Sequence, residues 1–88
     1  MSNQTVAEVL ASADDSVTLI NDINTNGSDS EYVAEGSTQD EINDMVQRNV
    51  DHLEIILAYT DPDVAGSSED KSSYTDAIAT GNAYIAAN

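Results

Sequence analysis

The sequence contains no cysteine, phenylalanine or tryptophan, and only one proline and four glycines in 88 residues. The absence of cysteine excludes disulfides and thiolate metal sites. Without the two largest apolar aromatic residues, a core has to be built mostly from valine, isoleucine and leucine. A chain of this length forms one small domain with a modest core, which leaves room for stabilisation by a partner or by self-association into a homo-oligomer.

Basic residues and long apolar runs are also scarce. Arg48 and Lys71 are the only lysine or arginine residues, against 17 aspartates and glutamates, and the formal net charge is −15. A surface of this charge repels nucleic-acid phosphates and anionic membranes, and this excludes direct binding to DNA, RNA or a membrane. No apolar run approaches the roughly 20 residues that span a bilayer, and no signal peptide is evident. The acidic surface suits solubility, adaptation to salt, cation chelation or a basic partner.

The strongest structural pattern lies between residues 39 and 59. Its apolar residues recur at steps of three and four, the period of one face of an α-helix: Ile42, Met45, Val46, Val50, Leu53, Ile56 and Leu57. Thr38 and Glu41 form a capping box at its start. Asp44 and Arg48 are an i,i+4 pair of opposite charge, and Pro62 lies beyond the end of the segment. We predict a central helix over 39–59.

Two further segments with helical periodicity flank this one, at about 6–22 and 73–86. The first is weakest at residues 12–16, and Val17, Leu19 and Ile23 after them partly alternate, so a break or a short strand is the rival interpretation. Gly27 is placed to end a helix, and Gly81 lies on an apolar stripe where it predicts close packing or a kink. The predicted fold is therefore all-α: an up-down-up three-helix bundle with exposed acidic connections at 24–37 and 60–71.

A partial calcium-loop pattern follows the first predicted helix. Asp22, Asn24, Asn26 and Gly27 match positions 1, 3, 5 and 6 of the loop, but position 12 is Val33 where a bidentate glutamate is required. Aspartate, asparagine and glycine also form ordinary turns after helices, which is the favoured interpretation. Asp22, Asn24 and Asn26 are nevertheless candidate metal ligands, and a weak calcium-binding helical module is one alternative function.

No catalytic constellation is recognisable in the sequence. His52 is the single histidine, and no nucleophile, base and orienting acid can be assembled around it. Serine and threonine lie mostly where caps and turns are expected. We therefore expect a non-enzymatic protein without a cofactor.

Aromatic and apolar side chains provide candidate contacts for a protein partner. These candidates are Tyr32, Val33, Tyr59, Tyr74 and Tyr84. For Tyr32 and Val33 the favoured interpretation is that they anchor the connection onto the bundle, and a patch for a partner is the alternative. A second interpretation is that acidic helices imitate the phosphate rows of DNA and inhibit a basic nucleic-acid-binding protein. Arg48 interrupts the acidic flank of the central helix, and many carboxylates lie in the predicted connections, so the best pattern for mimicry is missing.

Two stretches of the C-terminal half, RNVDHLEIILAY (48–59) and SYTDAIATGNAYIAAN (73–88), resemble small helical proteins encoded among bacteriophage structural genes. The resemblance implies a virion accessory role in capsid decoration, as an adaptor or in association with the tail. It implies a larger viral assembly as the partner and the virion as the location; outside a virus we expect a cytoplasmic protein. No role of an individual residue carries over.

Overall fold

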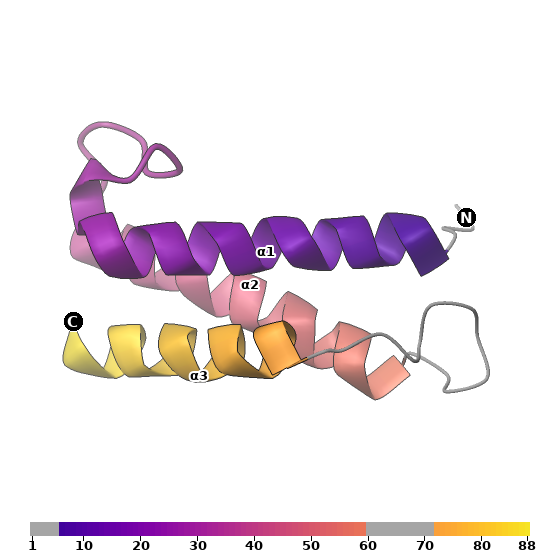
Figure 1. Cartoon of the computed structure of the whole chain (residues 1–88). Coiled ribbons are helices and arrows are strands. Elements are labelled where there is room, and N and C mark those ends of the chain that lie inside the picture. Colours follow the sequence, from indigo (N-terminus) through magenta and orange to yellow (C-terminus); the bar gives the residue numbers. More distant parts are fainter. Residues whose placement is uncertain (1–5, 60–71) are drawn as a thin grey trace.

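The computed structural model describes residues 6–59 and 72–88, which form three helices and one short 3-10 turn. These elements are α1 (Val6–Asn26), η1 (Gly27–Asp29), α2 (Gln39–Tyr59) and α3 (Ser72–Ala87). Helices α1 and α3 run in the same direction and α2 runs back behind them (Figure 1). Each helix packs against the other two, and no strand occurs in the described residues. The predicted all-α three-helix bundle is confirmed.

The apolar stripe of α2 forms the centre of the core. Its most deeply buried side chains are Ile42, Val46, Val50 and Leu53, each at most 1% exposed. The other buried apolar residues are Ala13, Ile20 and Ile23 from α1, Ile56 from α2, and Tyr74, Ala77 and Tyr84 from α3. Every residue of the stripe predicted for 39–59 is buried or half-buried. Helical periodicity therefore identified the buried face of α2 correctly.

Helix α1 continues beyond the predicted end at residue 22 and stops at Asn26. The extension is stable because Ile23 is fully buried in the core. Gly27 then adopts a φ of 58°, in the left-handed region, and ends the helix as predicted. The link to α2 therefore covers residues 27–38, not 24–37. The link predicted at 60–71 lies outside the described residues.

The polar segment at residues 12–16 remains helical, so the rival interpretation as a break or strand is wrong. Ala13 and Ser16 lie on its inner side and are buried. The Ser16 hydroxyl donates to Asn49 Oδ1 of α2 at 2.8 Å, and the Asn49 amide donates to the Met45 carbonyl at 2.8 Å. The polar residues of this segment that turn inward find partners on α2, so burial costs them little.

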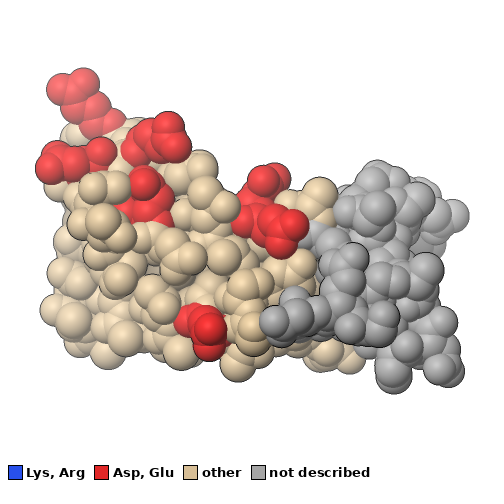
Figure 2. Space-filling model, viewed as in Figure 1, with Lys and Arg blue, Asp and Glu red and all other residues tan. Residues whose placement is uncertain are grey.

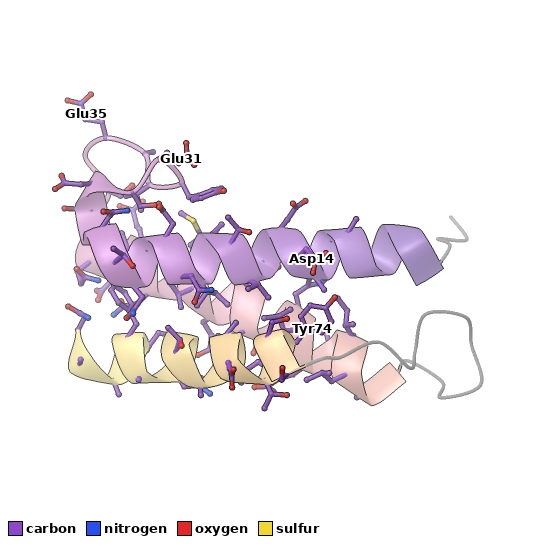
Figure 3. The ribbon with its side chains drawn as sticks, in the orientation of Figure 1. Asp14, Glu31, Glu35 and Tyr74 are labelled. Atoms are coloured by element: carbon purple, nitrogen blue, oxygen red, sulfur yellow. The ribbon has the colours of Figure 1, made fainter. Side chains whose placement is uncertain are left out.

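Two tyrosines tie α3 to the other helices. The Tyr74 hydroxyl donates to Asp14 Oδ1 of α1 at 3.1 Å (Figure 3), while Gln39 Nε2 of α2 donates to the Tyr84 hydroxyl oxygen at 3.0 Å. Both rings are buried and both hydroxyls reach the edge of the bundle. These contacts fix how far α3 slides along α1 and α2.

Gly81 of α3 faces side chains of both other helices at close range. A Cβ atom at this position would lie 2.5 Å from Val50 Cγ2, 3.3 Å from Val46 Cγ1 and 3.5 Å from Ile20 Cγ2. Valine methyl groups in a filled core have few other rotamers available. The close packing predicted for Gly81 is confirmed, since any side chain here would push α3 away from α1 and α2.

We predict that Gly81→Ala lowers the melting temperature. Alanine gains about 1 kcal/mol of helix propensity, but overpacking a filled core costs about 1–3 kcal/mol. The expected net loss is about 1 kcal/mol, or about 4–8 °C in a domain of this size. Thermal unfolding followed by circular dichroism measures the shift.

The matched control is Asn82→Ala, at the exposed neighbouring position of the same helix. It gains helix propensity without a steric cost, so its melting temperature should rise slightly. An equal rise for both variants would contradict the close approach at Gly81.

Candidate functional site at the connection and the start of α2

The connection between α1 and α2, residues 27–38, is anchored by Ser30. This side chain is only 3% exposed, and its hydroxyl donates to the carboxylate of Asp22 on α1. The Tyr32 backbone N–H donates to the Ser30 hydroxyl oxygen at 3.2 Å, and the Val33 N–H donates to the Ser30 carbonyl at 3.0 Å. The connection is therefore a series of hydrogen-bonded turns held to the end of α1.

The two apolar candidates in the connection have different surroundings. Val33 packs against the core, whereas Tyr32 is 36% exposed. Glu31 and Glu35 project away from the helices (Figure 3). Ser30 and Val33 turn inward and anchor the connection, which is the favoured interpretation of Val33 from the sequence. The outer side presents one aromatic ring beside carboxylates.

The other tyrosines predicted as partner contacts do not form an exposed surface with Tyr32. Tyr74 and Tyr84 are only 4% and 9% exposed, and both belong to the core, so their rings are not available to a partner. The side chain of Tyr59 lies outside the described part of the structure. Ile55 was not among the predicted contact residues, but it is 56% exposed on α2 and lies off the buried stripe. Its departure from the helical period was the signal that could have identified it.

The acidic residues are unevenly distributed over the face shown in Figure 2. Carboxylates gather over the connection at one end of the bundle, while most of the surface over α3 is uncharged. Helix α3 contains Asp76 as its single charged residue. Among the described residues on this face, the negative charge is therefore concentrated over the connection.

The predicted calcium ligands do not converge. Because α1 is helical as far as Asn26, residues two positions apart point to different sides of the helix. Asn24 therefore faces away from Asp22 and Asn26. The Asp22 carboxylate instead accepts hydrogen bonds from Ser30 and from Asn26 Nδ2, the latter at 2.9 Å. Among the described residues, no three histidine, aspartate or glutamate side chains lie close enough together to hold a metal ion. The loop geometry that calcium requires is absent here.

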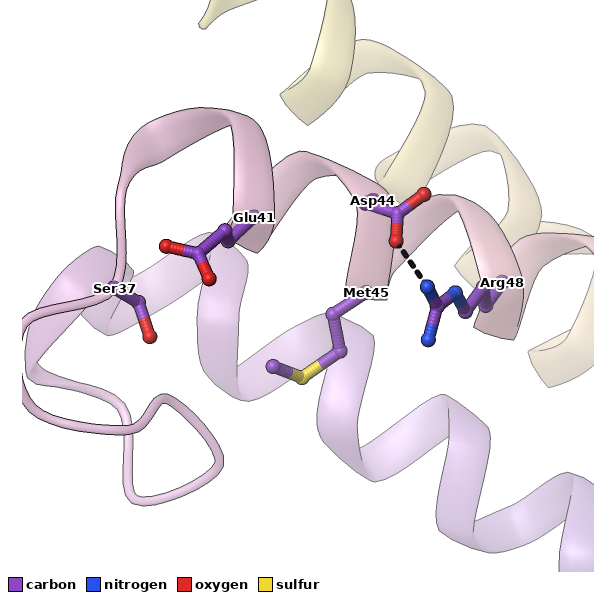
Figure 4. Close-up of a pocket in the computed structure, with 5 residues that line it drawn as sticks. All are labelled: Ser37, Glu41, Asp44, Met45 and Arg48. Carbon is purple, nitrogen blue, oxygen red and sulfur yellow. Dashed lines mark ion pairs between the residues drawn. The ribbon is translucent and has the colours of Figure 1, made fainter.

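A surface cleft of about 410 Å³ lies between the connection and the first turns of α2 (Figure 4). It is lined by Ser37, Glu41, Asp44, Met45 and Arg48. The Arg48 guanidinium lies 2.6 Å from Asp44 Oδ2, as the i,i+4 spacing predicted. Both side chains are mostly exposed, so this ion pair stabilises the helix by only about 0.3–0.5 kcal/mol. The cleft therefore combines two carboxylates, one guanidinium and a half-buried thioether.

The charge of Glu41 is fixed by the capping box. The Thr38 backbone N–H donates to Glu41 Oε1 at 2.8 Å, and the Glu41 N–H donates to the Thr38 hydroxyl oxygen at 3.2 Å. The backbone N–H of Thr38, and secondly its hydroxyl, lower the pKa of the Glu41 carboxyl below its ordinary value. The predicted capping box is confirmed, and Glu41 is ionised throughout the neutral range.

Folding brings Ser12 and His52 together, which the sequence did not reveal. Ser12 Oγ lies 2.8 Å from His52 Nε2, a contact between residues 40 positions apart. In catalytic sites a serine can act as a nucleophile with a histidine as its base, but a third group must orient the imidazole. Within the described residues, no hydrogen bond joins a carboxylate to the other ring nitrogen. The pair, like that of Ser16 and Asn49, connects α1 to α2.

Comparisons with protein-family models, curated proteins and solved structures find no match to this chain. In the described part of the chain, no helix has the length and apolar character needed to cross a bilayer. The function has to be inferred from the residues themselves and from how they are arranged.

We predict that Glu41→Gln lowers the melting temperature at pH 7 and that its effect disappears in acid. A carboxyl whose pKa is lowered by folding stabilises the native state above its unfolded pKa, and this contribution is lost as the pH falls through the folded pKa. The difference between wild type and variant should therefore shrink steadily below the ordinary glutamate pKa. Melting curves between pH 3 and pH 7 measure it.

Glu54→Gln is the matched control, because it removes the same charge from an exposed position in the second half of α2. Neutralising a carboxylate near a helix C-terminus should leave the melting temperature unchanged or raise it. A constant Glu41→Gln difference across the whole pH range would show that the capping box does not depend on ionised Glu41.

Proposed function

We propose that this chain is a non-enzymatic interaction protein, an accessory component of a bacteriophage virion that docks onto a larger protein assembly. The observation that carries the proposal is the anchored connection: Ser30 and Val33 hold it down while Tyr32 and its acidic neighbours face outward. An aromatic ring on a fixed backbone is a typical centre of a protein contact, because little conformational entropy is lost on binding.

The distribution of polar groups supports the same proposal. Ser12, Ser16 and His52 form interhelical pairs, and Thr38 and Glu41 form a cap. In the described residues, every buried side-chain nitrogen or oxygen has a hydrogen-bond partner. These groups stabilise the fold, and the surface remains for adhesion. The resemblance of residues 48–59 and 73–88 to phage-encoded helical proteins is the reason for proposing a virion as the assembly to which the chain binds.

The direct test is quantitative mass spectrometry of purified particles from cells that express this chain during infection. We expect the protein in assembled particles at a fixed copy number relative to a major structural protein. Its presence in the lysate alone, and never in particles, would refute the virion role.

We predict that Tyr32→Ala reduces incorporation into particles about tenfold, because loss of a central aromatic contact typically costs more than about 1 kcal/mol. The matched control is Ile55→Ala, which shortens the other large exposed apolar side chain described in the structure. Both variants should fold, since both side chains are solvent-exposed. Normal incorporation of Tyr32→Ala would place the docking surface elsewhere.

A DNA-mimic inhibitor is the second candidate, and a row of carboxylates on α2 favours it. Asp40, Asp44, Asp51 and Glu54 are all exposed, and their spacing puts them along one side of the helix. This candidate predicts binding to a basic nucleic-acid-binding protein that weakens strongly with salt and is competed by duplex DNA. Affinity that stays constant between 50 mM and 500 mM salt would exclude it.

A further inference from the structure

We propose that Asn26 is a site of spontaneous covalent modification, at which the side-chain amide is lost and the connection is loosened from the end of α1. This inference goes beyond the proposed docking function and does not depend on it. Three observations at one place in the fold carry it: the pair Asn26–Gly27, the open surface around this pair, and a hydrogen bond from the Asn26 amide to Asp22.

The reaction begins at the backbone nitrogen of Gly27. This nitrogen attacks Cγ of Asn26, the new C–N bond closes a succinimide ring, and the side-chain nitrogen leaves as ammonia together with the proton that the Gly27 nitrogen gives up. Water then opens the ring at either carbonyl and yields aspartate or isoaspartate. Asn26–Gly27 is the single asparagine–glycine pair in the sequence, and glycine favours the attack because it has no Cβ atom to hinder it.

The surroundings of the pair leave room for the ring. Asn26 is the last residue of α1, and its side chain is exposed. Gly27 begins the connection with a φ of 58°, and a Cβ atom placed on it would have no atom within 4 Å apart from its neighbours in the chain. Among the described residues, no packed side chain therefore obstructs ring closure.

The helical backbone at Asn26 controls the rate. Its ψ is −14°, which turns the Gly27 nitrogen away from the Asn26 side chain, so the bond between Cα and the carbonyl carbon must rotate before the ring can close. The hydrogen bond from Asn26 Nδ2 to Asp22 Oδ1, 2.9 Å long, opposes this rotation by holding the side chain along α1. The end of a helix opens at a lower free energy than the core. The fold therefore slows the reaction but does not prevent it.

The product weakens the contact that anchors the connection. Asp22 accepts hydrogen bonds from the Asn26 amide and from the Ser30 hydroxyl. After conversion, position 26 carries a carboxylate, which cannot donate and repels the Asp22 carboxylate four residues earlier on the same side of the helix. Isoaspartate also inserts a methylene group into the main chain between α1 and η1. Both products therefore pull Asp22 away from Ser30 and loosen residues 27–38.

The first experiment incubates the full chain at neutral and at mildly alkaline pH and follows each asparagine by peptide mass spectrometry. We expect aspartate and isoaspartate at position 26, formed faster at the higher pH because the attacking nitrogen has to lose its proton. Asn24 is the internal control, since it is exposed in the same last turn but precedes Thr25, and its amide should remain. An unmodified Asn26, or equal conversion of Asn24 and Asn26, would overturn the proposal.

A second experiment tests whether the last turn of α1 controls the rate. Asp22→Ala removes the acceptor of the Asn26 amide and the anchor of the connection, so it should accelerate conversion at least about threefold. The matched control is Asp15→Ala, the same change at an exposed position earlier in α1, which should leave the rate nearly unchanged. Equal rates in both variants would contradict the protection by Asp22.

A third experiment measures the consequence for the connection. Asn26→Asp reproduces one product, and Asn26→Gln keeps an uncharged amide whose longer side chain does not form the succinimide. Amide hydrogen exchange is followed at Tyr32 and Val33, whose backbone N–H groups donate to Ser30. Exchange should be about two- to fivefold faster in Asn26→Asp than in Asn26→Gln, because of repulsion from Asp22 and the negative charge at the helix C-terminus. Equal exchange in the two variants would show that the modification leaves the connection attached.

Discussion

The structure depends on the close approach of three helices at Gly81. Without phenylalanine or tryptophan, the core is filled by short branched side chains, by alanine and by two tyrosine rings. Such side chains fill a core only when the helix axes lie near one another. Gly81 makes this distance accessible because the methyl groups of Val46 and Val50 occupy the space that its own side chain would take. A small core is thus compensated by tight packing.

Polar contacts supply the specificity that the uniform apolar core lacks. Valine and isoleucine rows tolerate sliding, since one turn of helix resembles the next. The contacts of Ser16 with Asn49, and of Tyr74 with Asp14, are lost when a helix shifts by a turn. A hydrogen-bonded pair adds little net stability but is costly to break when buried, so these pairs select one alignment of the helices.

The acidic surface and the anchored connection lie together at one end of the bundle (Figure 2). Ser30 fixes the connection to Asp22, and the same segment leads through the capping box of Thr38 into α2, whose first turns form one wall of the cleft. Tyr32 and the cleft are therefore positioned by the same short stretch of chain. This end presents an aromatic ring, several carboxylates and the half-buried Met45, whereas the surface over α3 is mostly uncharged (Figure 2).

The sequence by itself determined the helices and the buried face of α2. Those features follow from interactions between residues a few positions apart: apolar spacing at 42–57, the capping box at Thr38, and the left-handed turn at Gly27. The tertiary structure alone decided the rest. It extended α1 to Asn26 through the burial of Ile23, and it joined Ser12 to His52 across 40 residues. Those outcomes depend on which surfaces the helices present to one another, and no local spacing encodes that choice.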